Sequence, residues 1–140
     1  MSNWLQRLIM NVHHFVFMRT GGRVGTSLGG RPMLVLRTTG RKSGEPRTAM
    51  LMYVRDGENY AVVGSHGGGP HHPGWYHNLS GTPEAEIQVG RSVVPVRAHV
   101  AEGEERERIW ANADKVNKGV YGRYQRGTER QIPVVVLEPR

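Results

Sequence analysis

The sequence predicts a small antiparallel β-barrel that carries a few peripheral helices. The turn signals Asp56-Gly57 and Gly90-Arg91 each adjoin stretches rich in strand-forming residues, as expected of β-hairpins. The final stretch, residues 132–137, is too apolar for an exposed edge strand. Strands and helices do not alternate regularly, so a doubly wound parallel sheet is not expected. The length of 140 residues fits a single domain.

The first predicted element is an amphipathic helix over about residues 3–18. Apolar residues such as Trp4, Leu8 and Val12 recur on one helical face, whereas Arg7 and Asn11 lie off it. Five glycines then predict an irregular loop over residues 21–30.

The remaining elements follow from turn residues and side-chain alternation. Strands are predicted at residues 33–39, 48–55, 59–64, 84–89, 92–101 and 132–137. A short helix is predicted at residues 75–79 and a longer one at residues 102–116, whose first turn is rich in Glu as the helix dipole favours. Residues 1–140 are therefore expected to form one barrel domain with an N-terminal helix.

Composition restricts the chemistry of the chain. It has no cysteine, which excludes disulfides, thiolate metal sites and cysteine nucleophiles. A net charge of +7 and a pI near 10.4 favour an anionic partner: nucleic acid, an anionic membrane or a polyanionic small molecule. No signal peptide is recognised and no apolar run approaches the ~20 residues that span a bilayer. We therefore expect a cytoplasmic protein, with association at a membrane surface left open.

Residues 38–47 form the first candidate site. They place Arg41, Lys42 and Arg47 with several hydroxyls and two glycines in one turn between predicted strands. Exposed amides and cations of this kind can form an anion-binding nest. The spacing is not that of a Walker motif, and a solvated basic hairpin turn is the alternative interpretation.

Residues 64–79 form the second candidate site. This glycine- and histidine-rich segment leaves a strand and enters a helix, where it could accommodate a phosphate or a planar ring. Its histidines lack the spacing of zinc ligands, so no metal is expected. Ser65 has no nucleophile elbow around it, which disfavours a hydrolase.

Together these stretches make the chain resemble the deazaflavin-dependent nitroreductase family, whose members use coenzyme F420. The resemblance spans roughly residues 34 to 138 and depends on residues 39–44 with Pro46-Arg47, Tyr53 with residues 55–57, Pro73 with Trp75-Tyr76 and Asn78-Leu79, and residues 132–136.

The resemblance implies a fold, a cofactor and a set of binding residues. The fold is a split β-barrel like that of the FMN-binding split barrels, and the cofactor carries a phosphate and an oligoglutamate tail. The residues implied to bind the tail are Thr39, Arg41, Lys42, Ser43 and Arg47. The other residues assigned to the cofactor site are Tyr53, Ser65, His66 and Trp75. Tyr53 could equally be a barrel residue and Trp75 a core anchor.

The resemblance also implies the chemistry. A hydride passes from the reduced deazaflavin to an organic acceptor, which is a quinone, a nitroaromatic or an activated alkene. Tyr121 and Tyr124 match tyrosines that line the acceptor pocket, and either of them or water could supply a proton. Packing against the barrel mouth is the alternative role for both. This chain has His66 where several relatives have lysine, and Lys118 at a third tyrosine position.

Two other functions are compatible with parts of the pattern. An FMN-binding split-barrel reductase would share the fold, but FMN has no glutamate tail to explain the basic turn. A nucleic-acid-binding barrel would use the same cations on phosphates, but no aromatic residue lies in the turn to stack on bases. The N-terminal helix is expected to dock on the barrel, with covering the acceptor site or contacting a membrane as alternatives. A monomer or weak oligomer is expected.

Overall fold

The computed structural model describes residues 27, 28 and 30–140, and the predicted helix over residues 3–18 lies outside them. The strands are β1 (Ser27–Leu28), β2 (Arg31–Thr39), β3 (Pro46–Met52), β4 (Val54–Asp56), β5 (Asn59–Val63), β6 (Glu84–Val89), β7 (Ser92–Val100) and β8 (Val134–Pro139). The helices are η1 (His66–Gly68), α3 (Gly74–Gly81), α4 (Gly103–Val116) and α5 (Val120–Arg126).

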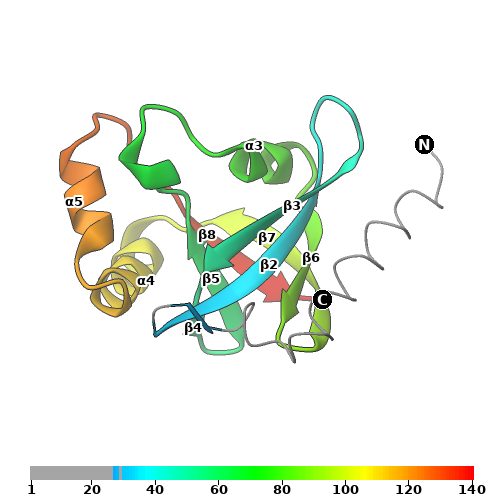
Figure 1. Cartoon of the computed structure of the whole chain (residues 1–140), viewed down its shortest axis with the longest axis horizontal. Helices are drawn as coiled ribbons and strands as arrows, with labels where there is room; N and C mark the ends of the chain where they lie inside the picture. The colour runs from blue at the N-terminus through cyan, green and yellow to red at the C-terminus, as the bar shows by residue number, and fades with distance from the viewer. Residues whose placement is uncertain (1–26, 29) are drawn as a thin grey trace.

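The strands form one curled antiparallel sheet (Figure 1). Its order is β1-β2-β6-β7-β8-β5-β4, and β3 pairs with the other side of the long strand β2. All pairings are antiparallel, as the hairpin signals predict. The last strand in the sequence, β8, lies between β5 and β7 and joins the two halves of the sheet. The predicted antiparallel barrel with peripheral helices is confirmed.

Tyr53 separates strands β3 and β4, which pair with different parts of the curled sheet. The sequence predicts one strand over residues 48–55, which is wrong, because β3 ends at Met52 and β4 begins at Val54. The backbone N–H of Tyr53 donates to the carbonyl of Pro32 at 3.0 Å. Strand β3 pairs with β2, whereas β4 pairs with β5, so the chain passes in one residue between strands at opposite ends of the sheet.

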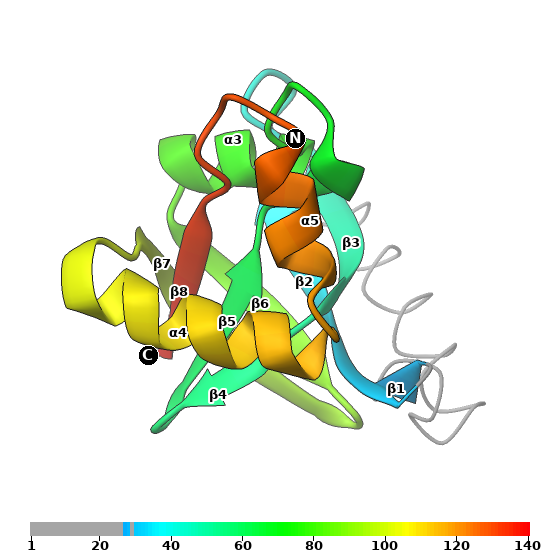
Figure 2. The ribbon, with the colours of Figure 1, turned by 90° about the vertical axis from the view of Figure 1, so that its left-hand side faces the viewer.

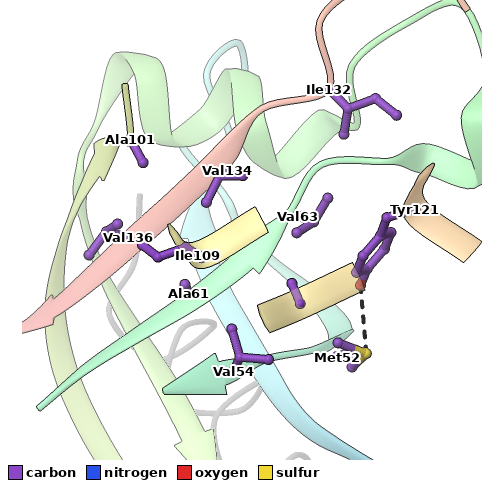
Figure 3. Packing of buried hydrophobic residues seen from close by; sticks show 11 residues of the cluster. Met52, Val54, Ala61, Val63, Ala101, Ile109, Tyr121, Ile132, Val134 and Val136 are labelled. Atoms are coloured by element: carbon purple, nitrogen blue, oxygen red, sulfur yellow. Dashed lines mark hydrogen bonds between the residues drawn. The ribbon is translucent and has the colours of Figure 1, made fainter. Parts of the chain in front are cut away.

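Both faces of β8 are buried over residues 134–137, which explains why this part of the strand is entirely apolar. Val134 and Val136 join a cluster beneath α4 and α5, whereas Val135 and Leu137 join a second cluster with Trp75. Figure 3 shows the first cluster, in which Ile109 of α4 and Tyr121 of α5 pack against the strands. Figure 2 shows α4 and α5 over one face of the sheet.

Local boundaries differ from the predictions where tertiary contacts decide them. Helix α5 is not predicted at all, because its seven residues include Gly122 and are too few to show helical periodicity. Residues 132 and 133 precede β8 rather than begin it, since Pro133 lacks the N–H that a ladder requires. Residues 27–28 pair with the start of β2 inside the predicted irregular loop.

Candidate functional site

A cleft of about 760 Å³ lies between the β2–β3 turn and the segment that follows β5. In both views this turn, η1 and α3 lie at the same end of the barrel (Figures 1 and 2). Ligand cavities commonly enclose roughly 300–1,000 Å³, so the cleft is large enough for a cofactor. The predicted site residues that line it are Arg41, Lys42, Ser43, Arg47, Ser65, His66 and Trp75. The structure therefore brings together the two segments that the sequence singled out.

The basic turn, residues 40–47, is a closed loop with its charges at the surface. The N–H of Gly40 donates to the carbonyl of Glu45 at 2.7 Å, and that of Gly44 donates back to Gly40 at 2.8 Å. A Cβ on Gly40 would lie 2.7 Å from the Ser43 hydroxyl and 3.1 Å from the Glu45 carbonyl oxygen, so a larger residue would displace Ser43. Arg47 Nη2 donates to Ser43 Oγ at 3.2 Å, which joins a cation and a hydroxyl at the cleft.

Asn78 of α3 anchors this turn, and the sequence analysis did not assign it a role in the site. Its side-chain oxygen accepts the backbone N–H of Arg41 at 3.0 Å, and its Nδ2 donates to Thr38 Oγ1 at 3.0 Å. Asn78 and Thr38 are both buried and both line the cleft. A buried amide with both ends satisfied fixes the turn relative to the helix.

A glycine loop, residues 64–69, forms the opposite wall. The amides of Gly68 and Gly69 donate to the carbonyls of Ser65 and His66 at 2.8 and 3.1 Å. Gly68 has φ of +78°, and a Cβ there would lie 3.0 Å from the Tyr124 ring. The loop therefore packs directly on α5. The Nδ1–H of His66 donates to the carbonyl of His71 at 3.2 Å.

The floor of the cleft is apolar. Trp75 is only 9% exposed and belongs to the second core cluster, yet it also lines the cleft. Its packing role and its place in the candidate site are therefore compatible. Leu51 and Val63 line the same floor. A flat, partly apolar surface beside cationic groups suits an aromatic ligand that bears anionic substituents.

Two predicted cofactor residues lie elsewhere. Thr39 lines a separate cavity of about 140 Å³ together with Arg37 and Glu86, and Thr38 lines both this cavity and the cleft. Successive residues of a strand point to opposite faces, and the Thr38 hydroxyl points to Asn78 at the cleft. Tyr53 packs edge-on against Tyr60 with 5.6 Å between ring centroids. Neither Thr39 nor Tyr53 lines the cleft.

Tyr121 and Tyr124 lie on α5, behind the glycine loop. The Tyr121 hydroxyl donates to Met52 Sδ at 3.8 Å within the first core cluster (Figure 3). Burial raises the pKa of Tyr121 to about 12. Tyr124 packs against Gly68. Neither ring lines the cleft, and the acceptor role of both tyrosines stays a prediction.

Within residues 27, 28 and 30–140, no group of three or more His, Asp or Glu side chains is arranged to hold a metal ion. None of the helices in this part of the chain is long and apolar enough to cross a membrane.

Comparison with known proteins identifies the family. The model of the F420H(2)-dependent quinone reductase family matches residues 9–139. An F420H(2)-dependent quinone reductase of Mycobacterium tuberculosis is 41% identical over 146 residues, which cover 99% of this chain and 98% of the relative.

Comparison with solved structures supports the same family. An F420-H2 dependent reductase is 43% identical with a TM-score of 0.71, covering 77% of this chain and 95% of its own. A structure described as a domain-swapped dimer is 36% identical with a TM-score of 0.73. The match covers 97% of this chain and 98% of the other. These neighbours confirm the predicted split β-barrel, and the chain belongs to the F420H(2)-dependent quinone reductase family.

Proposed function

We propose that the cleft binds a reduced deazaflavin and that this protein passes its hydride to a quinone. The observation that supports this most directly is the meeting of the basic turn and the glycine loop across one cleft. Coenzyme F420 combines a planar ring, a phosphate and a polyanionic tail. The cleft offers a partner for each of these parts.

The residues present fit such a cofactor. Arg41, Lys42 and Arg47 place three cations along one wall, where Glu45 supplies the turn's single carboxylate. Three cations beside hydroxyls and backbone amides suit a chain of carboxylates better than a single phosphate. Trp75 and the neighbouring aliphatic side chains offer a flat surface for the ring. FMN, with a phosphate and no glutamate tail, would leave part of the basic turn unused.

The reduced deazaflavin supplies the hydride when it is bound, and the protein supplies position and electrostatics. Lys42, Arg41 and Arg47 would hold the anionic tail of the cofactor. Asn78 fixes the turn from which these cations project. Ser65, His66 and the glycine backbone run along the other side, where the absence of side chains allows close approach. The apolar floor formed by Trp75, Leu51 and Val63 would exclude water from a bound ring.

Thr39 and Tyr53 are left out of this proposed site, because they lie away from the cleft. Tyr124 is proposed to lie near the acceptor, since it packs on Gly68 of the glycine loop. Tyr121 is proposed to support Tyr124 from the core. We also propose that residues 1–140 form one domain, because one continuous sheet connects all the described strands.

Fluorescence titration tests the cofactor assignment. The purified protein should bind the deazaflavin with micromolar or tighter affinity, and FMN much more weakly. A deazaflavin without the phosphate and glutamate tail should bind less tightly, because the cations then lose their partners. FMN binding that equals or exceeds deazaflavin binding would reject the proposal. Turnover with a soluble quinone and the reduced cofactor then tests the acceptor class.

A further inference from the structure

Arg130 lies in the segment between α5 and β8, and its guanidinium donates hydrogen bonds to the glycine loop. Nε donates to the carbonyl of Gly69 at 2.9 Å, Nη1 to that of Gly64 at 3.1 Å, and Nη2 to that of Ser65 at 2.6 Å. Nη1 also donates to His72 Nδ1 at 2.9 Å. Four of the five guanidinium N–H groups therefore bind one segment, residues 64–72.

Side chains from α4 and α5 form hydrogen bonds with the backbone around Arg130. Gln125 of α5 donates from Nε2 to the Arg130 carbonyl at 2.8 Å, and its Oε1 accepts the N–H of Ile132 at 2.8 Å. Arg106 of α4 donates to the Ile132 carbonyl at 2.7 Å. The guanidinium is thus presented to the loop from a fixed backbone rather than from a free surface chain.

The glycine loop depends on such a support because it lies outside the sheet. Without Arg130 the carbonyls of Gly64 and Gly69 would lose this partner, and that of Ser65 would keep only the Gly68 amide. Residues 66–68 all have positive φ. Ser65 and His66 line the cleft, whereas Arg130 does not. Three of the four acceptors of Arg130 are carbonyls of this same wall.

We infer that Arg130 is a positioning residue for cofactor binding: it fixes the carbonyls of the glycine loop so that Ser65, His66 and Gly67 line the cleft. This inference rests on the proposed function of the cleft. Arg130 acts through the loop and touches no reacting atom. Lysine cannot replace it fully, because one ammonium lacks the planar fork that reaches several carbonyls at once.

The contact with His72 adds a chemical requirement. Nδ1 can accept from Arg130 only when the imidazole is neutral. Burial, Arg130 and His77 together lower the pKa of His72 and so favour this neutral form. Tyr76 packs on the His72 ring with 4.6 Å between centroids and limits its reorientation.

The test compares Arg130→Gln, Arg130→Lys and the control Arg126→Gln, which removes the same charge from an exposed position on α5. Hydrogen exchange without cofactor should become faster for residues 64–72 in Arg130→Gln and stay unchanged for residues 92–100. The Kd of the deazaflavin should rise about tenfold. Arg130→Lys should restore part of this loss. With saturating cofactor, kcat and the acceptor KM should remain near the wild-type values, which a general structural defect would not leave intact.

Two results would overturn the inference. One is unchanged exchange of residues 64–72 in Arg130→Gln. The other is a deazaflavin Kd in Arg130→Gln no higher than in Arg126→Gln. If the wild-type protein itself fails to bind the deazaflavin, the proposed function fails, and the exchange data still show whether Arg130 holds the loop. The two failures are therefore distinguishable.

Discussion

Replacing Asn78 by alanine should loosen the basic turn and lower the stability of the fold. The change removes two hydrogen bonds at once, one to the backbone of Arg41 and one to Thr38 Oγ1, each 3.0 Å long. Asn78 is 8% exposed and Thr38 is 4% exposed, so water replaces the lost amide poorly at the threonine. The Arg41 N–H is nearer to solvent and should be satisfied more easily.

The expected cost follows from these contacts. Each hydrogen bond contributes about 1 kcal/mol, and an unsatisfied buried hydroxyl adds a further ~1 kcal/mol, which gives a total of about 2–3 kcal/mol. An entropy of unfolding near 2.1 cal/mol/K per residue corresponds to ~0.3 kcal/mol/K for a chain of this length, so Tm should fall by about 7–10 °C. The deazaflavin Kd should rise as well, because the cations lose their fixed base.

Thermal and urea unfolding would measure the effect. Ser80→Ala on the same helix is the control, since the Ser80 hydroxyl is exposed and bonds only the Tyr76 carbonyl. Thr38→Val completes a double-mutant cycle with Asn78→Ala, and the coupling should be about 1 kcal/mol. A loss no larger than that of Ser80→Ala, or strictly additive changes in the double mutant, would refute this reasoning.

Three further predictions concern charge and protonation. Lys42→Ala should weaken deazaflavin binding by roughly 5- to 100-fold at low salt and by less at 1 M salt, where the Debye length is ~3 Å; an equally small effect of Lys42→Ala and of Arg91→Ala in the β6–β7 turn would mean that the basic turn is only a solvated loop. Since burial raises the pKa of Tyr121 to about 12, its hydroxyl stays protonated up to about pH 10. The pH profile of turnover should therefore match between wild type and Tyr121→Phe, and an alkaline limb lost only in the variant would contradict this. The lowered pKa of His72 means that the unfolded chain binds more protons than the folded one as the pH falls through about 6.5, so the free energy of unfolding should decrease as the pH is lowered there. Urea unfolding of His72→Gln should show a flatter pH dependence, and an unchanged slope would count against the neutral ring that accepts from Arg130.

Much of the barrel could be predicted because its signals are local. The turn at Gly90-Arg91 and the alternation on either side of it specify a hairpin without reference to the rest of the chain. The break at Tyr53 could not be predicted in this way. It depends on a hydrogen bond to Pro32, and residues 48–55 carry no glycine or proline that would mark it.

In the candidate site, too, the residues that are close in the sequence could be predicted, whereas those that depend on the fold could not. The cations of the basic turn are contiguous in the sequence, so their grouping was predictable. Thr39 was chosen over Thr38, although only the latter faces the cleft, because the face of a strand depends on a register that the motif does not specify. Arg130 was not predicted, since the carbonyls it binds lie 61 to 66 residues earlier in the chain.

The position of β8 has a consequence for how the protein is made. Strand β8 is the last strand to leave the ribosome, yet it pairs with both β5 and β7. Until residues 134–139 emerge, a nascent chain exposes the unpaired edges of both strands and the apolar side chains that β8 covers. Barrel closure must then wait for residues 134–139, and it is expected to be slow because it requires contacts between distant parts of the chain. Chaperones that shield strand edges would therefore matter most before β8 emerges.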